Sequence, residues 1–143
     1  MISDVSAVAA DLLTRIQDKT ARVGIVGLGY VGLPLAHAFS RVDFPVTGFD
    51  VDVKKITALS QSKSYIQYIH DDIIAEMNAS GRFLATTDFS ALKDVSAVLM
   101  CVPTPLTKHR EPDMSYVVKT SRAIMPHLKK GHLIILESTT YPG

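Results

Sequence analysis

The chain has 143 residues, 47% of them hydrophobic and 20% charged, a length that allows one domain and a composition that excludes a disordered tail or a disulfide scaffold. The 15 Lys and Arg balance 14 Asp and Glu, and the net charge of +1 gives no electrostatic drive toward nucleic acid or anionic lipid. No apolar run approaches the roughly 20 residues that span a bilayer, no secretory signal pattern opens the chain, and a single cysteine suits a reducing compartment, so we expect a cytoplasmic protein.

Residues 1–20 are expected to form a leading amphipathic helix. One side of this helix gathers its apolar residues, which are Val5, Val8, Leu12, Leu13 and Ile16. The polar face is not basic, which argues against a membrane role and favours packing on the domain or on a neighbouring protein. Residues 21–143 are expected to form one domain.

Five short apolar runs in residues 21–143 are predicted to be buried strands. They are Arg22–Val26, Phe44–Phe49, Arg82–Thr86, Ala97–Val102 and His132–Glu137. Each run is shorter than a typical helix, and its apolar residues are too continuous for a half-exposed antiparallel strand.

Between these runs, apolar residues recur at helical spacing. The first such stretch begins at Leu33, another runs from Ile69 to a stop at Gly81, and a third opens near Asp113 as a possible cap. Strands that alternate with helices predict an α/β fold, in which a Rossmann-like parallel sheet carries helices on both faces within a single domain.

The strongest motif is Gly27-Leu28-Gly29-Tyr30-Val31-Gly32, which follows the first predicted strand and precedes a helix. In that position Gly27 permits the tight turn, Gly29 lets the backbone approach a pyrophosphate, and Gly32 lets the helix lie close to the sheet. The free N–H groups at Tyr30 and Val31 would then hold the anion without a basic side chain.

Pro34 limits where the helix after this turn begins, because proline cannot donate a backbone hydrogen bond. The regular helix must start near Val31 or have a loosened first turn, and either case leaves the amides of Tyr30 and Val31 available to phosphate. The alternative for the whole motif is a glycine turn that packs strand against helix and binds no ligand.

The second predicted strand ends at Asp50, 18 residues after Gly32. Dinucleotide-binding folds place an acidic residue about 20 residues after the glycine turn, where it bonds the adenosine ribose hydroxyls. A carboxylate there disfavours NADP, because like charges about 4 Å apart repel by about 4 kcal/mol at an effective dielectric of 20. We therefore predict NAD as the cofactor. Helix capping is the alternative role for Asp50, and Asp52 is a second candidate for that cap.

Four segments together resemble the UDP-glucose/GDP-mannose dehydrogenase family. They are Val23–Ala36, Gly48–Asp50, Cys101–Pro105 and Glu137–Gly143, in the family's order. Within the family, Pro103–Asp113 and Glu137–Gly143 most resemble the UDP-N-acetyl-glucosamine 6-dehydrogenases. The resemblance implies an NAD-dependent oxidoreductase that converts the C6 alcohol of a UDP-N-acetyl-hexosamine to a carboxylate for polysaccharide biosynthesis, in two hydride transfers to NAD. UDP-glucose and GDP-mannose stay open as substrates.

Carried over residue by residue, the resemblance implies a set of cofactor-binding residues: Gly27, Gly29, Tyr30, Val31, Gly32, Asp50, Lys55, Thr104 and Thr139. Tyr30 and Val31 would contact the pyrophosphate, and Asp50 the ribose with Lys55 beside it. Thr104 would contact the cofactor after the fourth strand, and Thr139 would lie near the nicotinamide after the fifth. From the residues alone, a hydroxyl that caps loop backbone is the alternative for both threonines.

The resemblance also implies a nucleophilic cysteine that traps the intermediate aldehyde, and we expect this cysteine and the sugar-binding domain downstream of Gly143. Cys101, at the end of an apolar strand, is expected to be a small inert hydrophobe. We therefore expect the chain to bind NAD without oxidising a nucleotide sugar alone, and the sugar to bind only the full-length enzyme. A homo-oligomer stays open. A noncatalytic dinucleotide-binding regulatory module is the alternative function.

No metal site is expected, because the five histidines lack paired ligand spacing. They are His37, His70, His109, His127 and His132. The basic run Lys108-His109-Arg110 has two open interpretations, a contact to a phosphate of cofactor or substrate and a solvated loop face.

Overall fold

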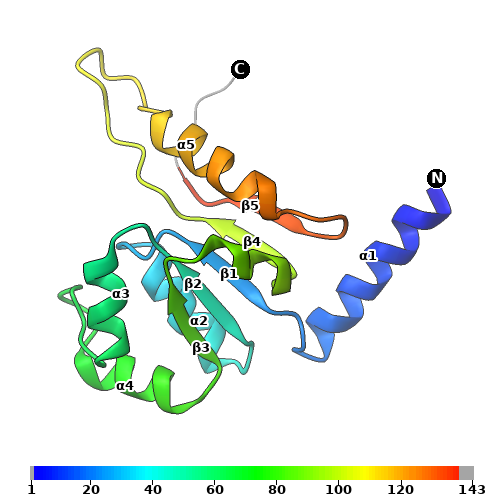
Figure 1. The fold of residues 1–143 in the computed structure, drawn as a ribbon, viewed down its shortest axis with the longest axis horizontal. Coiled ribbons are helices and arrows are strands. Elements are labelled where there is room, and N and C mark those ends of the chain that lie inside the picture. The colour runs from blue at the N-terminus through cyan, green and yellow to red at the C-terminus, as the bar shows by residue number, and fades with distance from the viewer. Residues whose placement is uncertain (1, 139–143) are drawn as a thin grey trace.

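The structure is a computed structural model that describes residues 2–138. A five-stranded parallel sheet in the order β3-β2-β1-β4-β5 forms its centre (Figure 1). The strands are β1 (Val23–Val26), β2 (Val46–Phe49), β3 (Phe83–Thr86), β4 (Ala97–Met100) and β5 (Leu133–Leu136). The predicted Rossmann-like sheet is confirmed. Its strand order reverses between β1 and β4, which is the point where such sheets bind ligands at the carboxyl ends of their strands.

Each strand is shorter than its predicted run, although the hydrogen bonds of the sheet continue past the strand ends. The N–H of Cys101 donates to the Val26 carbonyl at 2.7 Å, and the N–H of Glu137 donates to the Met100 carbonyl at 2.9 Å. Residues at strand ends therefore share the ladder without meeting the full pairing pattern.

Helices cover both faces of the sheet, as predicted. They are α1 (Ile2–Gln17), α2 (Gly32–Arg41), α3 (Val53–Ser60), α4 (Asp71–Ala79) and α5 (Ser115–Ile124), with short 3-10 helices η1 (Phe89–Asp94) and η2 (Met125–His127). Alternate side chains of β4 enter the two cores. Leu99 packs with residues of α2, α3 and α4, and Val98 packs with residues of η1 and α5.

The predicted helix that starts at Ile69 begins two residues later, at Asp71. Ile69 instead lies in the loop between α3 and α4, where it is buried in the core. Its apolar character reflects burial of a loop side chain, which periodicity alone does not distinguish from the first turn of a helix. The predicted stop is present, since Gly81 follows the helix with a φ of +68°.

Helix α1 projects away from the sheet at its amino-terminal end, and its carboxyl-terminal end leads into the domain (Figure 1). There Arg15 Nη1 donates a hydrogen bond to Ser96 Oγ at 2.7 Å, just before β4. Leu13 on the same helix is 55% exposed. Among residues 2–138, no helix has the length and apolar character needed to cross a membrane.

Candidate cofactor-binding site

The turn between β1 and α2 needs glycine at two positions because of the protein's own backbone. Gly27 has a φ of +96°, and a Cβ there would lie 2.6 Å from the carbonyl oxygen of Cys101. A Cβ on Gly32 would overlap the carbonyl oxygen of Gly27. The tight turn and the close approach of the helix predicted from the sequence therefore both have a steric origin.

Gly29 differs from these two glycines, because a Cβ added to it would meet no protein atom within 4 Å. The fold therefore leaves space at Gly29 that the protein itself does not use. Across the described part of the chain, the N–H groups of Gly29, Tyr30, Val31 and Gly32 have no protein hydrogen-bond acceptor. These donors open the helix, where unpaired amides and the helix dipole favour an anion.

Helix α2 starts at Gly32 with Val31 at its N-cap position, so Pro34 falls in its first turn. A first-turn residue has no intrahelical acceptor for its N–H, and proline there costs no hydrogen bond. The predicted start near Val31 is confirmed, and the first turn needs no loosening.

Asp50 lies directly after β2, is 7% exposed, and uses both carboxylate oxygens. Its Oδ2 accepts hydrogen bonds from the Leu28 N–H at 2.9 Å and from Lys55 Nζ at 3.1 Å, and its Oδ1 accepts from the Asp52 N–H at 2.9 Å. Asp52 caps α3 by accepting from the Lys54 N–H at 2.9 Å. The cap weighed for Asp50 thus belongs to Asp52, while Asp50 joins the glycine turn to the end of β2.

These residues border a cavity of about 870 Å³ at the carboxyl ends of β1, β2 and β4. Six of the predicted site residues line it: Gly27, Gly29, Tyr30, Val31, Asp50 and Lys55. Gly32 is buried behind the turn, and Thr104 is half-buried in the loop after β4 and is not among the lining residues. Thr139 lies outside the described residues.

The comparison with known families decides the identity of this domain. A family model described as the NAD binding domain of the UDP-glucose/GDP-mannose dehydrogenase family matches residues 21–143. The chain belongs to this family. Its cofactor is accordingly NAD, as predicted.

Relatives in the family include enzymes for several nucleotide sugars. UDP-N-acetyl-D-glucosamine 6-dehydrogenase of Pseudomonas aeruginosa is 38% identical over 125 residues, which cover 87% of this chain and 29% of that protein. UDP-N-acetyl-D-mannosamine dehydrogenase of Escherichia coli (strain K12) is 37% identical, with coverage of 86% and 29%. A crystal structure of GDP-mannose dehydrogenase from Pseudomonas aeruginosa superimposes with a TM-score of 0.79 at 33% identity, covering 85% of this chain and 29% of that one. The chain thus spans less than a third of the length of these relatives.

The residues present fit NAD by their donors, acceptors and space. Unpaired amides beside the open position at Gly29 suit a diphosphate. The carboxylate of Asp50 suits a ribose hydroxyl, since its Oδ1 accepts one protein hydrogen bond and has further acceptor capacity. The lining is otherwise largely apolar, with side chains such as Val31, Ile66 and Phe89, which is typical of cofactor pockets.

Two residues that line the cavity were not predicted from the sequence. Tyr65 and Ile66, in the loop between α3 and α4, line the cavity next to Asp50 and Lys55. Tyr65 Oη also donates a hydrogen bond to the Leu28 carbonyl at 2.7 Å. The only sequence signal was a cluster of apolar and aromatic residues in a segment without a helical or strand period.

Cys101 also lines the cavity, where it is 8% exposed. Burial, with a smaller contribution from the negative charge of Glu137, raises the pKa of the Cys101 thiol to about 11. Burial and the raised pKa both disfavour the thiolate, which is the nucleophilic form, and the inert character of Cys101 stays a prediction. Among the described residues, no group of three His, Cys, Asp or Glu side chains is arranged to hold a metal ion.

Proposed function

We propose that the cavity holds NAD with its diphosphate on the Gly27–Gly32 turn and its adenosine ribose on Asp50. The observation that carries the proposal is the open position at Gly29, which adjoins unpaired amides and lines the same cavity as Asp50. By family resemblance, Thr104 and Thr139 complete the proposed set of cofactor contacts.

When bound, NAD supplies a hydride acceptor, and the residues of this chain bind and orient it. The amides of the turn neutralise part of the diphosphate charge without a basic side chain. Asp50 accepts a hydrogen bond from the adenosine ribose, and its negative charge repels the additional phosphate of NADP. Lys55, which contacts Asp50 at 3.1 Å, fixes the orientation of that carboxylate.

We further propose that the full-length enzyme oxidises the C6 alcohol of a UDP-N-acetyl-hexosamine to a carboxylate. Relatives named for UDP-N-acetyl-D-glucosamine and UDP-N-acetyl-D-mannosamine at 38% and 37% identity support this substrate class. UDP-glucose and GDP-mannose are the alternatives. Because Cys101 is the only cysteine and is buried with a raised pKa, we propose that this chain alone does not oxidise the sugar. A cytoplasmic location and a homo-oligomer remain proposals.

Calorimetric titration of the folded chain with NADH and NADPH tests the cofactor site. We expect binding of NADH and a clear preference for it over NADPH. Undetectable NADH binding by folded protein would overturn the proposed function, and a preference for NADPH would remove Asp50 from the ribose site.

Incubation with NAD and each nucleotide sugar in turn tests the second proposal. With UDP-N-acetyl-glucosamine, UDP-N-acetyl-mannosamine, UDP-glucose or GDP-mannose, we expect no NADH fluorescence to develop. Turnover of any one of them by this chain would contradict the proposal and would identify the substrate.

A further inference from the structure

The loop between α3 and α4 places two tyrosines on the backbone of the glycine turn. Tyr65 Oη donates a hydrogen bond to the Leu28 carbonyl at 2.7 Å, and Tyr68 Oη donates one to the Tyr30 carbonyl at 2.6 Å. The rings of Tyr30 and Tyr68 also lie 6.3 Å apart between centroids. Phenol hydroxyls of a neighbouring loop therefore hold two alternate peptide groups of the turn.

The planarity of the peptide group decides what these two hydrogen bonds do. In a trans peptide the C=O of one residue and the N–H of the next point in opposite directions. A hydroxyl that holds the Leu28 carbonyl thus directs the Gly29 N–H the other way. The bond to the Tyr30 carbonyl does the same for the Val31 N–H. Gly29 and Val31 line the cavity, and both N–H groups are without a protein acceptor in the described residues.

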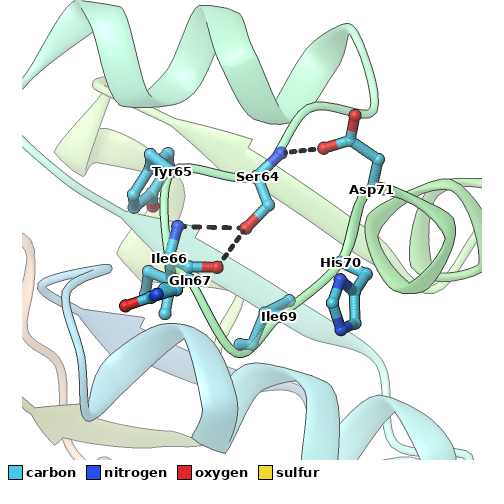
Figure 2. A pocket seen from close by; sticks show the side chains of 7 residues that line it. All are labelled: Ser64, Tyr65, Ile66, Gln67, Ile69, His70 and Asp71. Carbon is cyan, nitrogen blue, oxygen red and sulfur yellow. Dashed lines mark hydrogen bonds between the residues drawn. The ribbon is translucent and has the colours of Figure 1, made fainter.

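Core packing and hydrogen bonds hold this loop against the domain. Ile66 and Ile69 are each 4% exposed and anchor it in the core. Figure 2 shows Ser64 Oγ in hydrogen bonds with both the N–H and the carbonyl of Ile66, at 3.1 Å each. In the same view Asp71 Oδ1, at the start of α4, accepts from the Ser64 N–H at 2.8 Å.

We propose that Tyr65 and Tyr68 are positioning residues for the NAD diphosphate, acting through the peptide groups whose carbonyls they hold. Each forms a relay in which the hydroxyl donates to a carbonyl and the opposite N–H of that peptide donates to the phosphate. Linked hydrogen bonds of this kind polarise one another and strengthen the final donor. The inference rests on the proposed placement of the diphosphate on the turn.

The state of Tyr65 suits this role over the physiological pH range. Burial, together with the negative charges of Asp50 and Asp52, raises the pKa of Tyr65 above its usual value. The phenol consequently remains a proton donor. Lys55 Nζ lies 5.8 Å from the centre of the Tyr65 ring and also contacts Asp50. Tyr65 therefore lies between the proposed ribose site at Asp50 and the proposed diphosphate site on the turn.

Replacement of each hydroxyl tests the relay without removing the ring. We expect Tyr65→Phe and Tyr68→Phe each to weaken NADH and ADP-ribose by about 2- to 10-fold in calorimetric titration. Adenosine, which has no phosphate, should bind both variants within twofold of the wild type. Gln67→Ala is the matched control, because Gln67 is an exposed residue between the two tyrosines and is outside the large cavity.

The outcomes separate this inference from the function on which it rests. If wild-type protein binds no NADH, the proposed function fails and the relay with it. If the wild type binds NADH and both folded variants match it within twofold, the relay alone is wrong. An equal loss of affinity for adenosine would also overturn it, since that pattern indicates a general structural role.

A measurement on the unmodified chain keeps the inference testable even if a variant fails to fold. In an NMR titration with ADP-ribose, the amide protons of Gly29 and Val31 should shift downfield as they donate to the diphosphate. Unchanged Gly29 and Val31 resonances at saturation would overturn the proposal.

Discussion

The carboxylate of Asp50 accepts a hydrogen bond from the backbone N–H of Leu28 at 2.9 Å. The acidic residue directly after β2 is thereby tied to the glycine turn that follows β1. Hydrogen bonds to a charged acceptor are stronger than neutral ones, so the bond fixes the separation between the ribose acceptor and the phosphate donors. The proposed adenosine and diphosphate subsites form one preorganised unit.

Substitution of Asp50 by asparagine tests the charge while it keeps the shape of the side chain. We expect Asp50→Asn to weaken NADH by about 1.5–3 kcal/mol, the range for a hydrogen bond to a charged group, and to narrow the preference over NADPH. Paired titrations with the two cofactors measure both effects. Asp43→Asn serves as the control, because Asp43 lies before β2 and its ion pair with Arg82 is exposed. Unchanged NADH affinity in Asp50→Asn would exclude Asp50 from the site.

The glycines of the turn should respond to alanine in opposite ways. Gly29→Ala meets no protein atom, so we expect the free energy of unfolding to stay within about 1 kcal/mol of the wild type. NADH affinity should fall more than tenfold because the added methyl group occupies the space proposed for the diphosphate. Thermal unfolding and calorimetric titration on the same sample separate the two effects.

Gly32→Ala is the matched comparison for that variant. Its Cβ would overlap the Gly27 carbonyl oxygen, so the substitution should destabilise the fold itself, by several kcal/mol. Wild-type NADH affinity in Gly29→Ala would contradict the placement of the diphosphate at the turn.

The sequence was sufficient to predict features that depend on steric rules. The roles of Gly27 and Gly32, the parallel sheet and the start of α2 near Pro34 all follow from local geometry and strand spacing. Contacts made by a loop across the turn could not be predicted. Tyr65 reaches Leu28 over 37 positions of sequence, and its segment carries no period that fixes where the side chain points. The sequence likewise could not show that Thr104 lies outside the cavity lining, because that depends on the path of the loop after β4.

The buried thiol of Cys101 should react slowly with iodoacetamide. Its pKa is raised from 9.0 to about 11, so at pH 8 the folded chain should contain about a hundredfold less thiolate than the unfolded chain. The neutral thiol is favoured in the folded state, and its stabilising contribution is complete below pH 9 and is lost as the pH rises through about 11.

Mass spectrometry of alkylated protein with and without denaturant measures this difference. Cys101→Ala should give no labelled product, because the chain has one cysteine. Equal labelling rates at pH 8 in native and denatured protein would show that the thiol is not buried and that its pKa is not raised.

Removal of residues 1–20 tests whether the remaining chain is a self-sufficient cofactor domain. Helix α1 contacts the domain through Arg15, which bonds Ser96 before β4, and through Val8, which lies beside Gly131 before β5. Both contacts are at the amino ends of the strands, and the cavity is at the carboxyl ends. We therefore expect NADH affinity within twofold of the full chain and a loss of unfolding free energy of about 1 kcal/mol. Arg15→Ala in the full chain should reproduce that loss, as measured by thermal unfolding. Loss of NADH binding in a folded 21–143 chain would instead make the helix part of the cofactor site.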